Sequence, residues 1–242
     1  MRILMLTQFY PPIIGGEEQH VRALGQALAS RGHSVAVATL WHEGLPAREM
    51  DGAVRVHRLR GSVARLAALF SNSERRFAPP LPDPEITLAL RRLVACERPD
   101  IVHAHNWLVH SYLPLKRWTR APLVQSLHNY HRVCPTVTLM RDGAPCDGPE
   151  LARCLNCASH HYGPAKGMVT TLAHTVTRPW LRAAVDLYLP VSEAVAHGNR
   201  LPGSGLPYEV VPNFIADDIG ETTPAADAHA VSEPDAAVVE PY

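Results

Sequence analysis

The sequence predicts an α/β protein: a Rossmann-like parallel sheet with helices on both faces. Strand-like and helix-like segments alternate through most of the chain, which is the pattern of repeated βα units. Short runs rich in β-branched residues, such as residues 34–40, suit strands that are buried on both faces. Parallel strands in such units are joined by right-handed crossovers. We therefore expect one Rossmann-like domain over residues 1–215.

Local signals place the individual elements. A helix begins at about Glu17 and ends at Arg31, before a glycine stop. Asp83 is suited to cap a second helix whose first position is Pro84, and Ser192 is suited to cap a third. The expected strands are residues 2–7, 34–40, 53–59, 101–105, 122–128, 186–192 and 208–213, with 53–59 at an edge of the sheet.

Composition restricts the classes of function. The chain has 242 residues, 46% of them hydrophobic, which is enough for a real core. The formal net charge is zero, so we expect no nucleic-acid partner. No apolar run is long enough to cross a bilayer, and the N-terminal apolar run is too short for a signal peptide. We therefore expect a cytoplasmic protein with reduced thiols.

Two segments depart from the βα pattern. Residues 129–163 form a long, polar, cysteine-bearing insert, which exceeds an ordinary loop and needs a constraint of its own. Residues 216–242 carry seven carboxylates and no Lys or Arg, in a context rich in Ala and Pro. We expect this acidic tail to be disordered or to act as a linker.

The stretch "FYPPIIGGEEQHV" joins the first strand to the first helix. Gly15 and Gly16 allow positive φ and a close backbone approach, and the free N–H groups of the helix that follows favour a phosphate or carboxylate. The alternative is a tight turn whose acidic residues favour the helix dipole. The stretch lacks G-x-G-x-x-G, so an NAD cofactor and an oxidoreductase function are disfavoured.

Three histidines lie at the ends of two strands expected to be neighbours. His103 and His105 belong to "IVHAHN", and His128 ends "LVQSLHN". Ligands of open parallel sheets bind beyond the carboxyl ends of the strands, where the glycine turn also lies. An imidazole there can contact a sugar hydroxyl or move a proton. We expect site roles for His105 and His128, and a structural role for His103.

The insert carries the pattern C-x11-C-x7-C-x2-C, formed by Cys134, Cys146, Cys154 and Cys157. Four thiolates ending in C-x-x-C suit a tetrahedral structural zinc, and a histidine of the insert could replace one of them. An iron–sulfur cluster, a redox pair and ordinary thiols are the competing interpretations. Cys96 lies inside an expected helix and is assigned to the core.

Residues 55–77 combine several arginines with apolar residues, which is a basic amphipathic pattern. Such a segment could contact an anionic membrane surface, which would place the protein at the inner face of the membrane. The alternative is a solvated helix lying on the sheet.

With these residues in place, the chain resembles the N-terminal domain of family 4 glycosyltransferases, which have the GT-B fold. The resemblance rests on "RILMLTQFYPPIIGGEEQHVRALGQALASRGHSVAVAT", "RPDIVHAHNW", "LVQSLHN", "LYLPVSEAV" and "VVPNF", in the expected order. It implies that Gly15 and Gly16 lie at the mouth of an interdomain cleft and that His128 lies near the transferred sugar. Asn129 stands where the family often has an acidic residue. The candidate substrate-binding residues are Gly15, Gly16, Glu17, His105, Asn106 and Asn129, and His128 is the candidate catalytic residue.

The resemblance also implies a function. It predicts the acceptor-side domain of a retaining glycosyltransferase that moves a sugar from a nucleotide-sugar donor to a glycan or lipid-linked acceptor. The glycine-rich strand start and the Glu-x7-Glu motif of a donor-binding domain do not follow "VVPNF". We therefore expect little activity without a donor domain. The alternative is a non-catalytic binding or scaffold protein that uses the cysteine-rich insert and the acidic tail.

Overall fold

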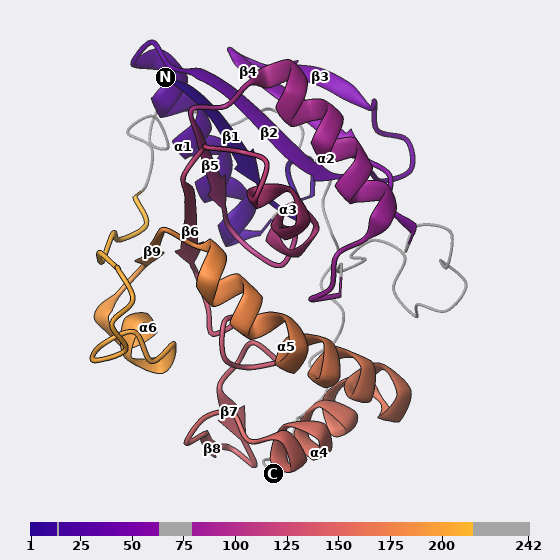
Figure 1. Cartoon of the computed structure of the whole chain (residues 1–242), viewed down its shortest axis with the longest axis vertical. Helices are drawn as coiled ribbons and strands as arrows, with labels where there is room; N and C mark the ends of the chain where they lie inside the picture. The colour runs from indigo at the N-terminus through magenta and orange to yellow at the C-terminus, as the bar shows by residue number, and fades with distance from the viewer. Residues whose placement is uncertain (14, 63–78, 215–242) are drawn as a thin grey trace, which may run out of the picture.

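The computed structural model describes residues 1–13, 15–62 and 79–214 (Figure 1). The acidic tail and most of the basic amphipathic segment lie outside these residues. The strands are β1 Arg2–Leu6, β2 Ser34–Leu40, β3 Arg48–Asp51, β4 Val54–Leu59, β5 Ile101–Ala104, β6 Leu123–Leu127, β7 Met140–Arg141, β8 Ala144–Pro145 and β9 Leu187–Pro190. The helices are α1 Gly16–Ser30, α2 Pro84–Glu97, α3 Val109–Lys116, α4 Leu151–Tyr162, α5 Pro164–Ala184 and α6 Glu193–Gly198.

The main sheet has seven strands in the order β3-β4-β2-β1-β5-β6-β9. Its neighbours pair in parallel except β3, which pairs antiparallel with β4. This order confirms the Rossmann-like expectation. The chain adds strands on one side of β1 first and then on the other side, starting with β5, so the switch point lies between β1 and β5.

Alternation along the strands divides the core between the two faces of the sheet. On β1, Ile3 and Met5 pack with Val21 of α1, whereas Leu4 and Leu6 pack on the opposite face with side chains of α2, α3 and α5. Both faces are therefore covered by helices, as the buried apolar runs predicted. Figure 1 shows α2 and α3 on the near side of the strands.

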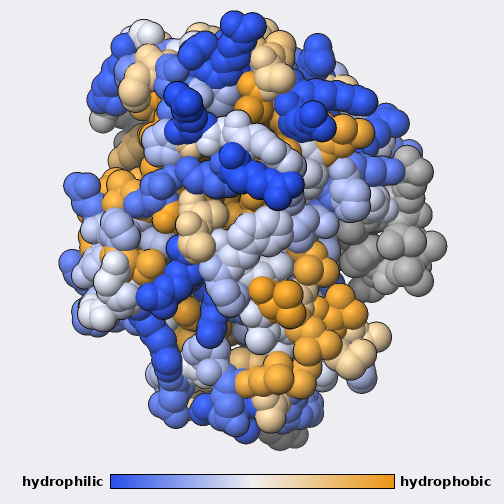
Figure 2. Space-filling view, in the orientation of Figure 1, coloured by the Kyte–Doolittle hydropathy of each residue, from blue (hydrophilic) through white to orange (hydrophobic). Residues whose placement is uncertain are grey.

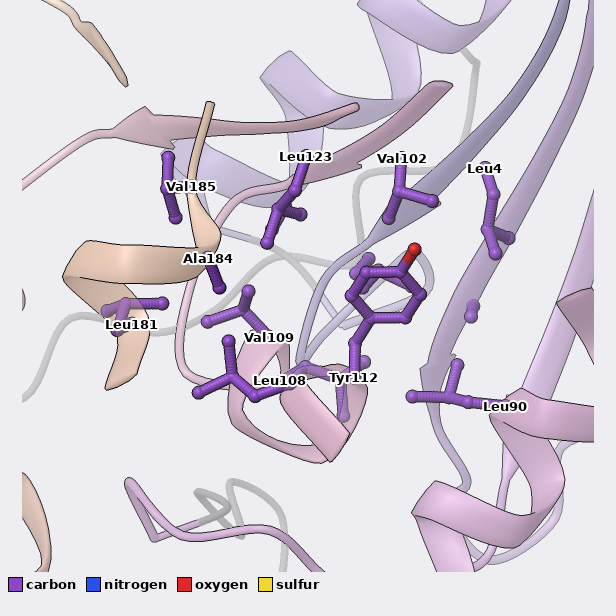
Figure 3. Packing of buried hydrophobic residues seen from close by; sticks show 14 of the residues in the cluster. Leu4, Leu90, Val102, Leu108, Val109, Tyr112, Leu123, Leu181, Ala184 and Val185 are labelled. Carbon is purple, nitrogen blue, oxygen red and sulfur yellow. The ribbon is translucent and has the colours of Figure 1, made fainter. Parts of the chain in front are cut away.

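Tyr112 of α3 is the centre of the second core region. Its ring is fully buried and lies among Leu4, Leu90 and Val102 (Figure 3). Its hydroxyl lies 2.7 Å from Oγ1 of Thr119, so the polar end of the side chain is hydrogen-bonded. This packing holds α3 against the face of the sheet next to β5.

The three predicted capping features are confirmed. Gly32 follows the end of α1 with a φ of 82°. The Asp83 carboxylate accepts hydrogen bonds from the N–H groups of Glu85 and Ile86 at the start of α2. The Ser192 hydroxyl accepts one from the N–H of Val195 in α6.

Four expectations about the framework are wrong. Residues 53–59 are not at the edge, because the polar run Arg48–Asp51 turns at Gly52 and pairs outside them as β3. Residues 208–213 form no full strand, although Tyr208 makes a single parallel bridge to Tyr188 of β9. The insert is not a loop, since it contains the β7–β8 hairpin and α4. Cys96 is exposed rather than part of the core.

The cysteine-rich insert packs as a helical hairpin. Gly163, with a φ of 86°, joins α4 to α5. Gly167 of α5 crosses α4 so closely that a Cβ atom there would lie 2.4 Å from the carbonyl carbon of Ala158. The β7–β8 hairpin and α4 form a lobe beyond the end of the main sheet, and α5 connects this lobe to the rest of the domain (Figure 1).

Part of the basic amphipathic pattern belongs to the sheet. Arg55 lies on β4 and pairs with Glu97 at 2.7 Å. Arg58 also lies on β4, is buried, and donates to a carboxylate oxygen of Glu49 at 2.6 Å. These two arginines therefore serve the fold. Arg60, the third arginine of the pattern within the described residues, stacks on the ring of Trp41. Residues 63–77, which carry the other residues of the pattern, lie outside the described residues.

Candidate active site

The candidate site lies at the switch point, beyond the carboxyl ends of β1, β5 and β6. On β5, Val102 and Ala104 point into the core on the side of α2 and α3. Alternation therefore turns His103 and His105 toward the face covered by α1. His128 follows the last residue of β6 and meets them there.

His105 connects these rings. It is fully buried, and its Nδ1 lies 3.2 Å from Nε2 of His128. The ring of His103 stands 4.2 Å from that of His105, and its Nε2 lies 2.8 Å from Oγ of Ser126. The hydrogen bond between His103 and Ser126 supports the structural role expected for His103, although the ring is in contact with the site.

His20 of α1 completes the group and was missed in the sequence. Its ring lies 5.2 Å from that of His128 and 5.1 Å from that of Phe214. The signal that could have found it is its position one helical turn after Gly16, facing the strand ends. We call His20, His103, His105 and His128 the histidine cluster.

The histidine cluster is neutral near pH 7. Burial, together with the neighbouring rings of His128 and His20, lowers the pKa of His103 to about 3. Burial and the ring of His20 lower the pKa of His128 to about 4, although a contact with the Asn213 side chain acts in the opposite direction. Burial also lowers the pKa values of His20 and His105. Nδ1 of His20, Nε2 of His105 and Nδ1 of His128 are buried and have no hydrogen-bond partner among the described residues. A ligand hydroxyl could bind these ring nitrogens only after neighbouring side chains move aside, because the nitrogens are shielded from solvent.

The glycine turn places a carboxyl group next to the cluster. Gly15 caps α1, and Oε1 of Glu17 accepts a hydrogen bond of 2.5 Å from Nδ2 of Asn106. The Asn106 amide oxygen accepts from the N–H of Gln8 at 3.0 Å, so it links the ends of β1 and β5. Burial raises the pKa of Glu17 to about 8, although the Asn106 hydrogen bond acts in the opposite direction. The charge of Glu18, the second acidic residue in the first turn of α1, also raises the pKa of Glu17.

The glycines at the turn act through their size. Gly15 has an extended φ of −166°, and Gly16 is the first residue of the helix, so the expectation of positive φ is wrong. A Cβ on Gly16 would meet no atom within 4 Å. On Gly15, by contrast, a Cβ would lie 3.0 Å from the carboxyl carbon of Glu18, so a larger residue there would displace that side chain.

Asn129 is turned away from the crevice. Its Oδ1 accepts a hydrogen bond from the backbone N–H of His131 at 2.9 Å, and its carbonyl accepts one from Nδ2 of Asn199. The side chain thus shapes the turn after His128. Of the predicted substrate-binding residues, the structure brings Gly15, Gly16, Glu17, His105 and Asn106 together around His128 and leaves Asn129 at the side.

The four cysteines of the insert come from three segments that approach one another. None of them forms a disulfide. Burial raises the pKa of Cys154, and the other three thiols of the insert raise it as well. Burial and the thiols of Cys134 and Cys146 raise the pKa of Cys157. Within residues 1–13, 15–62 and 79–214, however, no group of three or more His, Cys, Asp or Glu side chains is arranged to hold a metal ion.

Comparison with solved structures relates this arrangement to known enzymes. The chain superimposes on sucrose-phosphate synthase from Thermosynechococcus elongatus with a TM-score of 0.55 and 15% identity, over 87% of this chain and 47% of that one. The catalytic domain of starch synthase IV from Arabidopsis thaliana gives a TM-score of 0.51 and 14% identity, over 89% of this chain and 52% of that one. The class of fold is therefore that of GT-B glycosyltransferases.

The sequence assigns the family. Residues 15–213 match the Glycosyl transferase 4-like domain, and the chain belongs to this family. It is 33% identical over 140 residues to a glycogen synthase of Mycobacterium tuberculosis, covering 53% of this chain and 33% of the relative. It is 30% identical over 136 residues to an uncharacterised glycosyltransferase of Methanocaldococcus jannaschii, covering 53% and 31%. The matched region spans about one third of these relatives, and the resemblance seen in the sequence is confirmed.

Proposed function

We propose that this chain is the acceptor-side domain of a retaining glycosyltransferase, which moves a sugar from a nucleotide-sugar donor to a glycan or lipid-linked acceptor. The observation that carries the proposal is the histidine cluster at the switch point of a glycosyltransferase 4-like domain. Its buried ring nitrogens and the Asn106 amide offer neutral polar groups at the ends of β5 and β6. Neutral hydrogen-bonding groups suit sugar hydroxyls better than charged groups do.

The reaction breaks the bond between the anomeric carbon and the diphosphate oxygen of the donor. It forms a bond from that carbon to an acceptor oxygen, and the acceptor proton passes to the departing diphosphate. No nucleophile of the protein is needed. The first N–H groups of α1, near Gly15 and Gly16, favour the negative charge that develops on the diphosphate. His128 contacts the transferred sugar, and His105 orients its ring.

The neutral state of His128 defines its role. With a pKa of about 4, the His128 ring is almost entirely unprotonated near pH 7, so the protonated form that could act as a general acid is hardly populated. It can donate or accept one hydrogen bond through Nδ1, because Nε2 faces His105. This supports a positioning contact with a sugar hydroxyl rather than proton transfer.

The donor is held by a second domain in this proposal. A GT-B reaction needs donor and acceptor to be fixed across a cleft, and the loss of that proximity costs orders of magnitude in rate. We therefore expect the chain to bind UDP-, GDP- and ADP-sugars weakly by itself and to require a donor-binding partner for transfer.

The test has two steps on the full chain. Native mass spectra with UDP-, GDP- and ADP-glucose measure donor binding by the chain alone. Transfer of labelled glucose from the same donors is then measured with an extract of the source cells from which the chain's own gene has been deleted. His128→Ala is compared with His197→Ala, which removes an exposed ring on α6.

The proposal expects no stable donor adduct, and transfer that depends on both chain and extract and falls about a hundredfold in His128→Ala. His197→Ala should transfer label like the wild type. Transfer that is unchanged in His128→Ala would contradict the site. Absence of transfer together with capture of one protein through the insert would favour the scaffold function instead.

A further inference from the structure

His131 lies in the turn after His128, and both its ring and its carbonyl group are held by other parts of the fold. The residue is 3% exposed. Nδ1 of the ring lies 2.9 Å from Oδ1 of Asn129, and Nε2 lies 3.0 Å from Nε2 of Gln125 on β6. Burial lowers the pKa of His131 to about 3, and the neighbouring histidines and Arg132 act in the same direction. The ring is therefore neutral near pH 7.

The orientation of the Asn129 amide fixes the tautomer of this ring. The backbone N–H of His131 also lies 2.9 Å from Oδ1 of Asn129, and a backbone N–H can only donate. The amide atom that faces both groups is therefore the oxygen. Because that oxygen accepts, Nδ1 of His131 carries the ring proton, and Nε2 accepts a hydrogen bond from the Gln125 amide. Both ring nitrogens thus have a defined partner and a defined direction.

The carbonyl group of His131 joins the turn to two further elements. It accepts a hydrogen bond from Nε2 of His174 on α5 at 3.0 Å and another from Nε1 of Trp107, just before α3, at 3.3 Å. The side chains of His174 and Trp107 are both buried. Since α5 also crosses α4 closely at Gly167, the turn is tied to the helix that holds the cysteine-rich insert.

Helix α5 directs polar side chains toward this part of the interior. The buried Thr177 hydroxyl donates to the carbonyl of Pro80 at 3.0 Å, whereas Val176 is 72% exposed. Figure 2 shows an orange patch in the region where Figure 1 places α5 and α4. Although α5 has 21 residues, none of the described helices is both long and apolar enough to cross a bilayer. Hydrogen bonds therefore help to seat α5, and the His131 carbonyl is one of their acceptors.

We propose that His131 is a positioning residue that holds the turn after β6 and thereby the ring of His128. Its hydrogen bonds reach β6, α5 and the segment before α3, so one residue connects the turn to three parts of the core. Gln125 alternates along β6 with Leu123 and Leu127, which pack on the side of α3 and α5, so the turn is held from the face opposite to the histidine cluster. Such a network orients its members because a broken bond leaves a polar group unpaired away from water.

His110 provides a matched comparison in the same region. It is 2% exposed, and burial lowers its pKa to about 4, so its ring is also buried and neutral. Its Nδ1 lies 2.9 Å from the carbonyl oxygen of Trp107, three residues earlier in the chain. This hydrogen bond stays within the start of α3, whereas those of His131 connect separate elements. The same substitution at both positions therefore separates positioning from packing.

The test compares His131→Phe with His110→Phe in the full chain. Phenylalanine keeps a buried ring and forms no side-chain hydrogen bond. His131→Asn is the conservative variant, because its amide N–H can occupy the place of Nδ1. The first measurement is the titration of His128 by NMR with histidine labelled with ¹⁵N, and His128→Ala identifies the signal. The second is labelled-glucose transfer by chain and extract, and circular dichroism checks that each variant is folded.

We expect the protonation midpoint of His128 to rise by about one pH unit in His131→Phe, because a loosened turn lets water reach the ring. The midpoint should be unchanged in His110→Phe and largely restored in His131→Asn. In transfer, kcat should fall about tenfold in His131→Phe with KM nearly unchanged, because the sugar contact of His128 is misaligned rather than removed.

An unchanged titration of His128 in folded His131→Phe would overturn the proposal, and so would equal effects of the two phenylalanine variants. If His131→Phe does not fold, Gln125→Leu removes only the partner of Nε2 and should raise the His128 midpoint in the same direction. The role of His128 in transfer rests on the proposed function, but the state of its ring is measured without transfer. If the wild type transfers no label, the proposed function fails and the titration alone decides whether His131 positions His128.

Discussion

Nδ1 of His105 lies 3.2 Å from Nε2 of His128, so one of these nitrogens carries the proton that the other accepts. If His105 donates, Nδ1 of His128 holds a proton and presents a donor to the crevice. If His128 donates, the same Nδ1 presents an acceptor. The buried His105 ring therefore sets which hydrogen bond His128 can offer to a ligand.

Replacement of His105 should lower turnover more than substrate affinity. We expect His105→Ala to reduce kcat about tenfold and to leave KM nearly unchanged, because the orientation and tautomer of His128 are lost. His105→Asn, whose amide can occupy the place of Nδ1, should restore most of the rate. The measurement is labelled-glucose transfer by chain and extract. An equal loss in His105→Ala and His105→Asn would assign His105 to packing alone.

Glu17 should make the folded chain less stable as the pH rises. Its pKa is about 8 in the fold and near 4.5 in the unfolded chain. Between these values the folded state binds more protons, so stability declines from about pH 4.5 upward and levels off above pH 8. Glu17→Gln cannot ionise and should flatten this decline.

The measurement is the urea midpoint at several pH values between 5 and 8.5. Glu43→Gln, at an exposed position, is the control and should follow the wild type. The histidine cluster acts in the opposite direction, because its lowered pKa values remove stability as the pH falls below 6.5. An identical slope for Glu17→Gln and wild type above pH 6.5 would contradict the raised pKa.

The sequence predicted the framework because its signals are local. Asp83 caps α2 through its own neighbours, and the buried run at residues 34–40 needs no partner to be identified as a strand. The ends of β5 and β6 also followed from the sequence, so the proximity of His105 and His128 was predicted. These elements are specified by side chains a few residues apart.

The missed features depend on contacts between distant residues. His20 belongs to the site only because α1 crosses the ends of β5 and β6. β3 is polar and becomes a strand by pairing with β4, and α4 is held by its crossing with Gly167. The pKa of Glu17 depends on enclosure by elements far away in the sequence. For β3, the α4 crossing and the pKa of Glu17, no local pattern could have indicated these relationships.

Zinc in the insert remains a prediction. Sγ of Cys134 lies 3.2 Å from Oγ1 of Thr136, and the Thr136 side chain is also hydrogen-bonded to the thiol of Cys157. A bound zinc would draw these thiols to about 2.3 Å from the metal and deprotonate them. We expect about one zinc per chain in elemental analysis, lost in Cys154→Ser with Cys157→Ser and retained in Cys96→Ser. A folded, metal-free chain with titratable thiols would contradict this.

The close crossing of α4 and α5 should depend on the absence of a Cβ atom at Gly167. A Cβ at Gly167 would lie 2.4 Å from the backbone of Ala158, which cannot move as a flexible side chain could. Gly167→Ala should therefore force the two helices apart and destabilise the fold by about 2 kcal/mol or more, despite the better helix propensity of alanine.

Gly25 in α1 provides the matched control. A Cβ there would meet Val54 at 3.5 Å, an ordinary contact, so Gly25→Ala should be neutral or stabilise by about 0.5–1 kcal/mol. Urea unfolding compares the two variants, and hydrogen exchange locates the loss. We expect faster exchange in residues 151–184 of Gly167→Ala and unchanged exchange in β1 and β5. Equal effects of the two substitutions would mean that helix propensity, not the crossing, controls stability at Gly167.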